Sequence, residues 1–252
     1  MKVSLITVSF NSKNTITDTI KSVKSQTYKD IEYIIVDSCS DDGTQEILRN
    51  NRGNIDHLII EKDKGIYDAM NKGIRASSGD LIGIINSDDF YKDNNVISNV
   101  VSMAKKNTTL DVILTDISFI NKRNDEIRKV SSKRFKTWLL RFGWMPPHPG
   151  MFMRRKALNK IGFYDISYKI AADFEYCIRL FYLHGINFGY LKLTSVFMRE
   201  GGISTQNILS NMIITKEMLR ALRFHKIYSN TIILILRLPI KFLIKYLSRF
   251  RK

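Results

Sequence analysis

The sequence predicts an α/β protein in which helices flank a mostly parallel sheet. Two observations carry this prediction. The first third of the chain alternates strand-like and helix-like segments, an order typical of a parallel sheet covered by helices. Hydrophobic residues make up 44% of the 252 residues and charged residues 25%, an ordinary globular composition that leaves extensive disorder unsupported. A chain of this length can bury one sizeable core, or one core plus a small appendage.

Apolar runs and turn signals place the elements of the first third. Residues 3–10 are rich in β-branched side chains and predict the first strand. Ile16, Ile20 and Val23 follow at helical spacing and predict a helix over residues 14–26. Further strands are expected at residues 32–37, 58–61 and 81–85. A turn at residues 40–44 caps a short helix that ends at residue 48, and another helix is expected at residues 66–76.

The second half is less regular. We expect a strand at residues 110–120, a basic segment at 122–141 that includes a loop, and a turn-rich segment at 144–150 whose prolines exclude a helix interior. Further on we expect a helix at residues 173–184, with Gly185 as its stop, a strand at 194–198, and mainly helix from residue 208 to the end.

The charge of the chain narrows the classes of partner. The formal net charge is +16, and so basic a surface favours phosphates, whether of nucleic acid, anionic lipid or small diphosphates. Cys39 and Cys177 lie far apart, and no metal-binding Cys/His spacing exists, so we expect free cysteines in a reducing compartment. We see neither a signal peptide nor an apolar stretch of about 20 residues. The sequence therefore predicts a cytoplasmic protein, unless it is held to a membrane from the side.

Polar residues follow each predicted strand of the first third. In open parallel sheets, ligands bind at the carboxyl ends of the strands, so these residues are expected to outline one site. They are Ser9 to Asn11, Asp37 and Ser38, Glu61 to Asp63, and Asn86 to Asp89.

The acidic pair in the last of these groups allows two interpretations. Asp88 and Asp89 are adjacent carboxylates at a strand end, a pattern that suits a hard divalent cation able to bridge to a diphosphate. The same pattern also suits the N-cap of a helix. The residues alone favour neither interpretation.

A set of short motifs runs along the chain from residue 3 to about residue 204. They are Thr7-Val8-Ser9-Phe10-Asn11, Ile35-Val36-Asp37-Ser38, Asp41-Asp42-Gly43-Thr44, Asp63-Lys64-Gly65-Ile66-Tyr67-Asp68-Ala69-Met70-Asn71, Gly79-Asp80, Asn86-Ser87-Asp88-Asp89, His148, Ala172-Asp173-Phe174-Glu175 with Arg179, and Gly201-Gly202-Ile203-Ser204. In their order and spacing, these motifs resemble glycosyltransferase family 2, which has the GT-A fold. The resemblance is nearest to the bacterial enzymes that assemble O-antigens, capsules and colanic-acid-like polysaccharides.

The resemblance implies a role for each candidate residue. Asp173 would be the general base that takes the proton from the acceptor hydroxyl as it attacks the anomeric carbon with inversion. Glu175 is the alternative base, but side chains two residues apart on a helix diverge by roughly 200°, and the resemblance selects Asp173. The other implied sets are nucleotide binding by Thr7, Ser9, Asp37, Asp63, Asn71 and Asp88, metal binding by Asp89 and Asp88, and acceptor or diphosphate contacts by His148, Arg179, Arg199 and Ser204.

The resemblance also implies substrates and a division of the chain. The donor would be a UDP- or GDP-sugar, used with Mn²⁺ or Mg²⁺ by a hexosyl- or N-acetylhexosaminyltransferase, and the acceptor a polyprenyl-diphosphate-linked glycan. Residues 1–205 would form the GT-A domain, with nucleotide-sugar binding in residues 1–100 and acceptor binding in 101–205. Many family members have aspartate where this chain has Asn86, a departure that removes one negative charge from the expected metal site.

The end of the chain has the pattern of a basic amphipathic helix. Arg237, Lys241, Lys245 and Arg249 recur every four residues between apolar positions. Such a helix lies in a membrane interface or packs on the core with its charged face in water. We favour the first, because the charge is of one sign. Residues 206–252 are therefore expected to associate with the membrane, which would make the protein peripheral on the inner face of the plasma membrane.

Two other functions are compatible with parts of the sequence. The charge alone suggests a basic protein that binds nucleic acid, but the carboxylate-lined sheet edge would repel a phosphate backbone unless a metal were present. We therefore expect no nucleic-acid partner. A protein that binds nucleotide sugars without catalysis is the other alternative, and the presence of both Asp89 and Asp173 argues against it.

Overall fold

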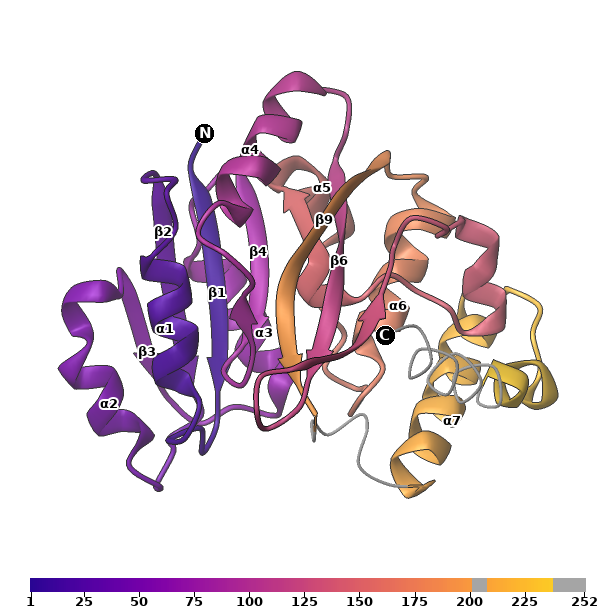
Figure 1. The fold of residues 1–252 in the computed structure, drawn as a ribbon. Helices are drawn as coiled ribbons and strands as arrows, with labels where there is room; N and C mark the ends of the chain where they lie inside the picture. The colour runs from indigo at the N-terminus through magenta and orange to yellow at the C-terminus, as the bar shows by residue number, and fades with distance from the viewer. Residues whose placement is uncertain (201–207, 238–252) are drawn as a thin grey trace.

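The computed structural model describes residues 1–200 and 208–237 and contains one sheet flanked by helices (Figure 1). The strands are β1 (Val3–Ser9), β2 (Ile31–Asp37), β3 (His57–Ile60), β4 (Leu81–Asn86), β5 (Phe90–Tyr91), β6 (Val112–Ile120), β7 (Glu126–Val130), β8 (Met151–Arg154) and β9 (Phe188–Arg199). They lie in the order β3-β2-β1-β4-β8-β6-β9-β5, and β7 pairs with β6. The predicted α/β fold class is confirmed.

The first four strands form a parallel half-sheet. β1 pairs in parallel with β2 and β4, and β2 pairs in parallel with β3. Ser9 lies opposite Asp37, and Val8 lies opposite Asn86. The carboxyl ends of these strands therefore meet at one edge, the lower edge in Figure 1. The polar residues that follow the strands gather there, as the sequence predicts.

The second half of the sheet is mixed rather than parallel. β8 runs antiparallel to both β4 and β6, β7 runs antiparallel to β6, and β5 runs antiparallel to β9. β7 lies within the basic segment that was expected to include a loop. A tight turn at residues 121–125 joins it to β6, and antiparallel neighbours need no crossover helix. A 3₁₀-helix, Thr137–Phe142, occupies the end of the same segment.

Helices cover both faces of the sheet. On one face lie α1 (Ile16–Lys24), α2 (Thr44–Asn50) and α4 (Val96–Lys106); on the other lie α3 (Ile66–Ala76), α5 (Arg155–Ile161), α6 (Ala172–Cys177) and α7 (Ile208–Phe224). Ile6 and Val8 of β1 face the second group, whereas Val3 and Leu5 face the first. Burial on both faces explains why the strand sequences are almost continuously apolar.

Close contact holds α3 against the central strand. A Cβ atom built on Gly73 would lie 2.4 Å from Cγ2 of Ile6, so the helix approaches β1 more closely than a residue with a side chain would allow. This approach positions the turn before α3, where Asp63 lies, at the carboxyl edge of the sheet.

A buried carboxylate ties the opposite, amino-terminal edge together. The Glu32 carboxylate accepts hydrogen bonds from Lys2 Nζ at 2.7 Å, from the Ser4 hydroxyl, and from Ser78 N at 2.7 Å and Oγ at 2.6 Å. Burial alone would raise the pKa of Glu32, but the hydrogen bonds outweigh it and lower the pKa to about 2. Glu32 is therefore ionised at neutral pH.

The two segments predicted as helix, residues 173–184 and residue 208 onward, each contain a break. A π-helical turn, Ile178–Leu183, continues α6, and residues 231–237 form a separate helical stretch after α7. Met218, Leu219 and Leu222 of α7 pack into the core of the second face, and Figure 1 shows α7 beside α6. Throughout the two described ranges, no helix is both long and apolar enough to cross a membrane.

Arg237 differs from its predicted place on an exposed basic face. It is only 2% exposed, because it packs inward against α7, so this part of the prediction is wrong. Helical spacing identifies a shared face but not the surroundings of that face. The other members of the predicted stripe, Lys241, Lys245 and Arg249, lie outside the described residues. Cys39 and Cys177 are both free, as expected.

Candidate active site

The acidic loop after β4 contains buried oxygen atoms that lack partners. Asp89 is 1% exposed, and its Oδ2 accepts a hydrogen bond from Asn86 Nδ2 at 3.1 Å. Asp89 Oδ1 and Asn86 Oδ1 are buried without a hydrogen-bond partner. Burial first, and then the charge of Asp88, raise the pKa of Asp89 well above its usual value. A divalent cation would satisfy both oxygens, so these residues fit a Mn²⁺ or Mg²⁺ ion.

Protein side chains alone form a sparse cation site here. Across the described ranges, no group of three or more His, Cys, Asp or Glu residues is arranged to hold a metal ion. Asn86 supplies an amide where a third carboxylate would complete such a group. A cation at this edge would therefore depend on further oxygens, such as those of a diphosphate.

Arg199 brings a positive charge from β9 to the same loop. Its guanidinium donates to Asp18 Oδ2 at 2.6 Å and to the Asp88 carbonyl at 2.8 Å, and it lies 4.9 Å from the centre of the Phe90 ring. Arg199 thus lies beside the acidic pair, as a diphosphate contact requires. Ser204, predicted for the same region, lies outside the described residues.

The nucleotide-binding candidates at the strand ends have different surroundings. Asp37 is fully buried and accepts hydrogen bonds from Ser40 N at 2.9 Å and Ser40 Oγ at 2.6 Å. Ser9 is 4% exposed, and its hydroxyl has no partner. Asp63 accepts a hydrogen bond from Gly65 N at 2.8 Å, at the turn that opens α3. These three residues lie at the carboxyl edge of the parallel half-sheet.

Two further nucleotide-binding candidates have partners inside the protein. The buried Thr7 hydroxyl lies 3.1 Å from the Tyr33 hydroxyl, beneath the sheet surface. Asn71 donates to the Tyr164 carbonyl at 2.8 Å and accepts from Tyr164 N at 2.9 Å. Asn71 therefore ties α3 to the chain before α6, and direct nucleotide contact by either residue stays a prediction.

Asp173, the predicted base, lies in the first turn of α6. Its Oδ1 accepts a hydrogen bond from Phe174 N at 2.8 Å and lies 3.5 Å from the Tyr67 hydroxyl. Its Oδ2 lies 3.9 Å from His148 Nδ1. The side chain is 21% exposed, so its carboxylate is accessible to a ligand. The structure thus brings Asp173 and His148 together, although 25 positions separate them in the chain.

Burial lowers the pKa of His148 to about 4. The imidazole is therefore neutral at pH 7, and one ring nitrogen donates a hydrogen bond while the other accepts one. Nε2 is buried and has no partner in the structure. A neutral His148 suits a role in orienting a hydroxyl beside Asp173.

Glu175 and Arg179 form a separate ion pair. Arg179 donates to both Glu175 oxygens, at 2.8 to 3.0 Å, and also to the Ile161 and Phe163 carbonyls. His225 Nε2 lies 2.8 Å from Glu175 Oε1. These contacts engage the Arg179 guanidinium with Glu175 and with backbone carbonyls, so a contact of Arg179 with the acceptor or the diphosphate stays a prediction. They also leave Glu175 without access to a substrate, which supports Asp173 over the alternative base.

Sequence patterns did not reveal Glu217, which fixes the chain just before Asp173. Its carboxylate accepts hydrogen bonds from Lys169 N at 2.8 Å, Ile170 N at 3.0 Å and Ala171 N at 2.9 Å. A glutamate on an amphipathic helix carries no signal of such a role, since its partners are backbone groups 46 to 48 positions away.

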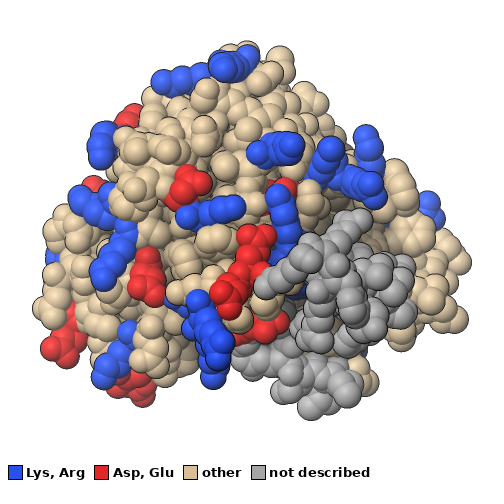
Figure 2. Space-filling model, in the orientation of Figure 1, with Lys and Arg blue, Asp and Glu red and all other residues tan. Residues whose placement is uncertain are grey.

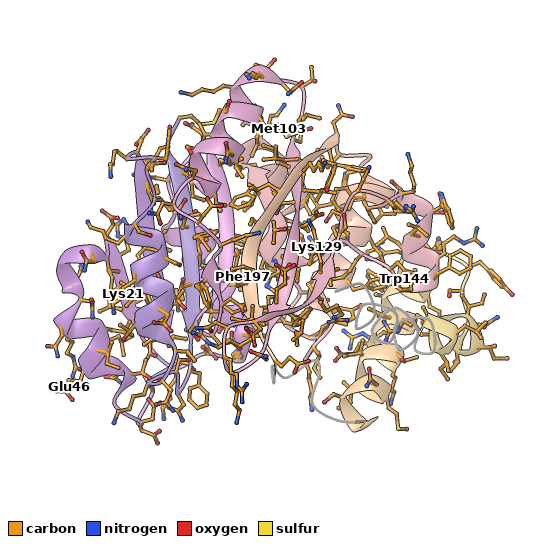
Figure 3. All side chains as sticks on the ribbon, viewed as in Figure 1. Lys21, Glu46, Met103, Lys129, Trp144 and Phe197 are labelled. Atoms are coloured by element: carbon orange, nitrogen blue, oxygen red, sulfur yellow. The ribbon has the colours of Figure 1, made fainter. Side chains whose placement is uncertain are left out.

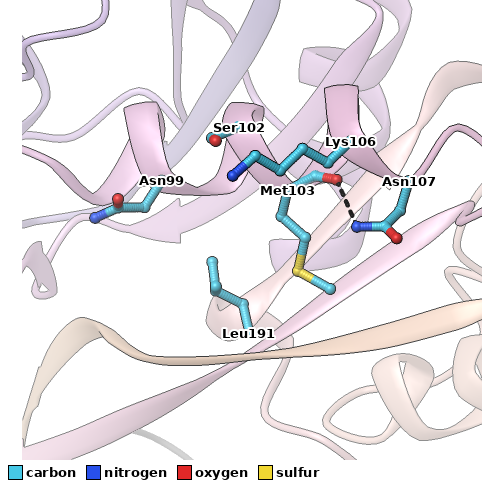
Figure 4. A pocket seen from close by; sticks show the side chains of 6 residues that line it. All are labelled: Asn99, Ser102, Met103, Lys106, Asn107 and Leu191. Atoms are coloured by element: carbon cyan, nitrogen blue, oxygen red, sulfur yellow. Dashed lines mark hydrogen bonds between the residues drawn. The ribbon is translucent and has the colours of Figure 1, made fainter.

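Asp173 and His148 line a cavity of about 410 Å³ between the Pro-rich segment, the β6–β7 hairpin and α7. Trp144 and Lys129, both labelled in Figure 3, belong to its lining, as do Arg128 and Arg237. A second cavity has a volume of about 380 Å³ and lies between the end of α4 and Leu191 of β9. Figure 4 shows the side chains that line it. Its described lining contains one lysine and no carboxylate. This second cavity therefore lacks a group that could act as a general base or bind a metal ion.

Comparison with known proteins identifies the family. The family model for glycosyl transferase family 2 matches residues 4–167. The chain belongs to this family. A PGL/p-HBAD biosynthesis glycosyltransferase of Mycobacterium bovis is 28% identical over 206 residues, which cover 81% of this chain and 77% of the relative. The putative teichuronic acid biosynthesis glycosyltransferase TuaG of Bacillus subtilis is 39% identical over 94 residues, which cover 36% of this chain and 37% of TuaG.

Solved structures support the fold of this family member. S. aureus TarS 1-349, in complex with UDP-GlcNAc, matches with a TM-score of 0.71 at 18% identity, over 88% of this chain and 66% of TarS 1-349. The mannosyltransferase PcManGT from Pyrobaculum calidifontis, in complex with GDP-Man and Mn²⁺, matches with a TM-score of 0.63 at 17% identity, over 89% of this chain and 64% of PcManGT. The chain thus spans only part of these longer proteins, and at such identities the likeness shows the fold alone.

Proposed function

We propose that the protein is an inverting glycosyltransferase that moves a hexosyl or N-acetylhexosaminyl group from a UDP- or GDP-sugar to a hydroxyl of a glycan acceptor. The observation that carries this proposal is the accessible Asp173 carboxylate, which lines a cavity together with a neutral His148. The relatives' names support a role in bacterial surface polysaccharide biosynthesis, and the nucleotide sugars bound by TarS and PcManGT support the class of donor.

The chemistry follows from a single displacement. The acceptor oxygen attacks the anomeric carbon, and the bond from that carbon to the diphosphate breaks with its electron pair on the leaving oxygen. Asp173 takes the proton of the attacking hydroxyl, and His148 orients that hydroxyl. Asn86, Asp88 and Asp89 would hold a Mn²⁺ or Mg²⁺ ion, whose chemistry would be to neutralise charge on the departing diphosphate. Arg199 adds a fixed positive charge at the same edge.

A polyprenyl-diphosphate-linked acceptor would place the reaction at a membrane surface. The net charge of +16 favours anionic lipid headgroups, and we propose a peripheral position on the inner face of the plasma membrane. Nucleic acid is the weaker alternative. Figure 2 shows Lys and Arg scattered over the face in view with Asp and Glu among them, whereas a nucleic-acid site gathers its basic residues into one patch or stripe.

The test is the melting temperature of the purified protein with a panel of nucleoside diphosphates, with and without Mn²⁺. A ligand that binds only the folded state raises the melting temperature. We expect a Mn²⁺-dependent rise with UDP or GDP, and a smaller rise in Asp89→Ala. A rise with RNA or DNA but with no nucleotide would overturn the proposal. A full, metal-dependent rise in Asp89→Ala would show that Asp89 is not a metal ligand.

A further inference from the structure

Arg237 is a buried cation that has no counter-ion among the residues that the structure describes. The residue is 2% exposed, and its guanidinium donates to Met218 Sδ and, at 3.2 Å, to the Thr215 hydroxyl. Its Nε has no hydrogen-bond partner, and among residues 1–200 and 208–237 no carboxylate lies within ion-pair distance of it. Burial lowers the pKa of Arg237 only to about 10, so the group is charged at pH 7. A buried charge without a partner is unfavourable unless a ligand supplies the opposite charge.

The shape of the chain around Arg237 accommodates its guanidinium. Gly143 has a φ of +73°, in the left-handed region that favours glycine, and a Cβ there would lie 3.2 Å from Arg237 Cδ and 3.3 Å from Nη1. The guanidinium therefore packs beside a glycine that precedes Trp144. Trp144 and Arg237 line the same cavity as Asp173.

Besides Asp173, the rest of the cavity combines basic side chains with apolar walls. Arg128 stacks over the Phe119 ring at 4.1 Å, while Lys129 pairs with Asp116 at 3.0 Å. Ile214 and Met218 of α7 supply apolar surface. An anionic group attached to a hydrocarbon chain matches this combination: the anion pairs with the buried guanidinium, and the chain covers the apolar side chains.

The same anion chemistry has two sources in the proposed reaction, the donor diphosphate and the acceptor. The donor side has its own charged groups at the carboxyl edge, and the described lining of this cavity includes neither Asp88, Asp89 nor Arg199. We propose that Arg237 binds a phosphate group of a lipid-linked acceptor in the cavity that contains Asp173. This inference rests on the proposed function, because Asp173 there faces the acceptor hydroxyl.

The test measures binding of farnesyl diphosphate, farnesol and inorganic pyrophosphate to the full chain. Trp144 lines the cavity, so tryptophan fluorescence gives a local signal. The variants are Arg237→Met, which removes the charge beside Met218, and Arg223→Met, a matched change at an exposed arginine of α7. We expect farnesyl diphosphate to bind at least about tenfold tighter than farnesol, and Arg237→Met to abolish that difference. Arg223→Met keeps it.

Two outcomes would overturn the inference. One is an unchanged affinity of Arg237→Met for farnesyl diphosphate. The other is pyrophosphate binding as tight as that of farnesyl diphosphate and in competition with UDP or GDP, which would assign Arg237 to the donor. If Arg237→Met does not fold, Arg237→Lys carries the test, with affinity reduced about tenfold because ammonium lacks the planar fork; an unchanged affinity would again refute the proposal.

Nucleotide binding separates this inference from the proposed function. If only the inference fails, UDP or GDP still raises the melting temperature of the wild type and of Arg237→Met equally. If the proposed function fails, no nucleotide does so in either protein.

Discussion

Replacing Glu217 with glutamine should impair catalysis without removing any group that touches a substrate. In the wild type, Glu217 Oε1 accepts the Lys169 N–H, and Oε2 accepts those of Ile170 and Ala171. Glutamine has a single acceptor oxygen. If that oxygen takes the place of Oε2, the amide NH₂ faces the Lys169 N–H, so one charge-assisted hydrogen bond is lost and the other two weaken.

The magnitude follows from these three hydrogen bonds. A hydrogen bond to a charged group contributes about 1.5–3 kcal/mol, so the loss of one and the weakening of two should lower the free energy of unfolding by about 2–4 kcal/mol. For a chain of this size, that corresponds to a fall in melting temperature of roughly 5–15 °C. The segment that these bonds hold, residues 169–171, ends two residues before Asp173. A displacement of about 1 Å at a reacting group can reduce the rate about a hundredfold.

Two measurements on Glu217→Gln check this reasoning. The melting temperature should fall, and kcat should fall by about ten- to a hundredfold while the KM for the donor stays unchanged. Glu46→Gln is the matched control, since Glu46 is an exposed glutamate on α2, away from the cavity residues Lys129 and Trp144 (Figure 3). Its effect on stability should stay within about 0.5 kcal/mol. Equal melting temperatures and equal kcat for Glu217→Gln and the wild type would refute the positioning role.

Three further predictions concern the scaffold. Because the pKa of Glu32 is lowered to about 2, its carboxylate should stabilise the protein above about pH 4.5 and lose this contribution as pH falls toward 2. Glu32→Gln should remove that part of the pH dependence of stability, measured by urea titrations at several pH values. An unchanged pH dependence would contradict this prediction. Asn71→Ala should lower the free energy of unfolding by about 2–4 kcal/mol, since the buried Tyr164 N–H and C=O lose their hydrogen-bond partner. A decrease of less than about 1 kcal/mol in the same titration would contradict this prediction. Gly73→Ala should destabilise by about 1–3 kcal/mol because its Cβ meets Ile6, and a higher melting temperature would show that α3 lies further from β1.

The parallel half-sheet was predictable because its strands are apolar and are followed by polar residues. β5 was missed because a segment of two residues carries no measurable period. β8, with four residues, was missed because it follows directly on the turn-rich segment at residues 144–150. β7 was missed because it is partly exposed and includes the charged residues Arg128 and Lys129. A run of charged residues is more typical of a loop than of a strand. Mixed pairing in the second half could not be inferred without these strands.

The candidate site divides in the same way. Asp89 and Asp173 were found because they stand in motifs that resemble those of a known family. Glu217 and Arg237 were not found as site residues, because their surroundings depend on how α7 and residues 231–237 pack against the core. Periodicity showed which residues share a helix face with Arg237, but not that Arg237 points inward.

The most direct test of the central claim compares Asp173→Asn with the wild type in one assay. Release of UDP or GDP from UDP-GlcNAc, UDP-glucose and GDP-mannose is followed in the presence of bacterial membranes as the source of acceptor, alongside nucleotide affinity. If Asp173 is the base, the variant should bind nucleotide as tightly as the wild type and release it about 10² to 10⁴-fold more slowly. Release at the wild-type rate by Asp173→Asn would contradict the account.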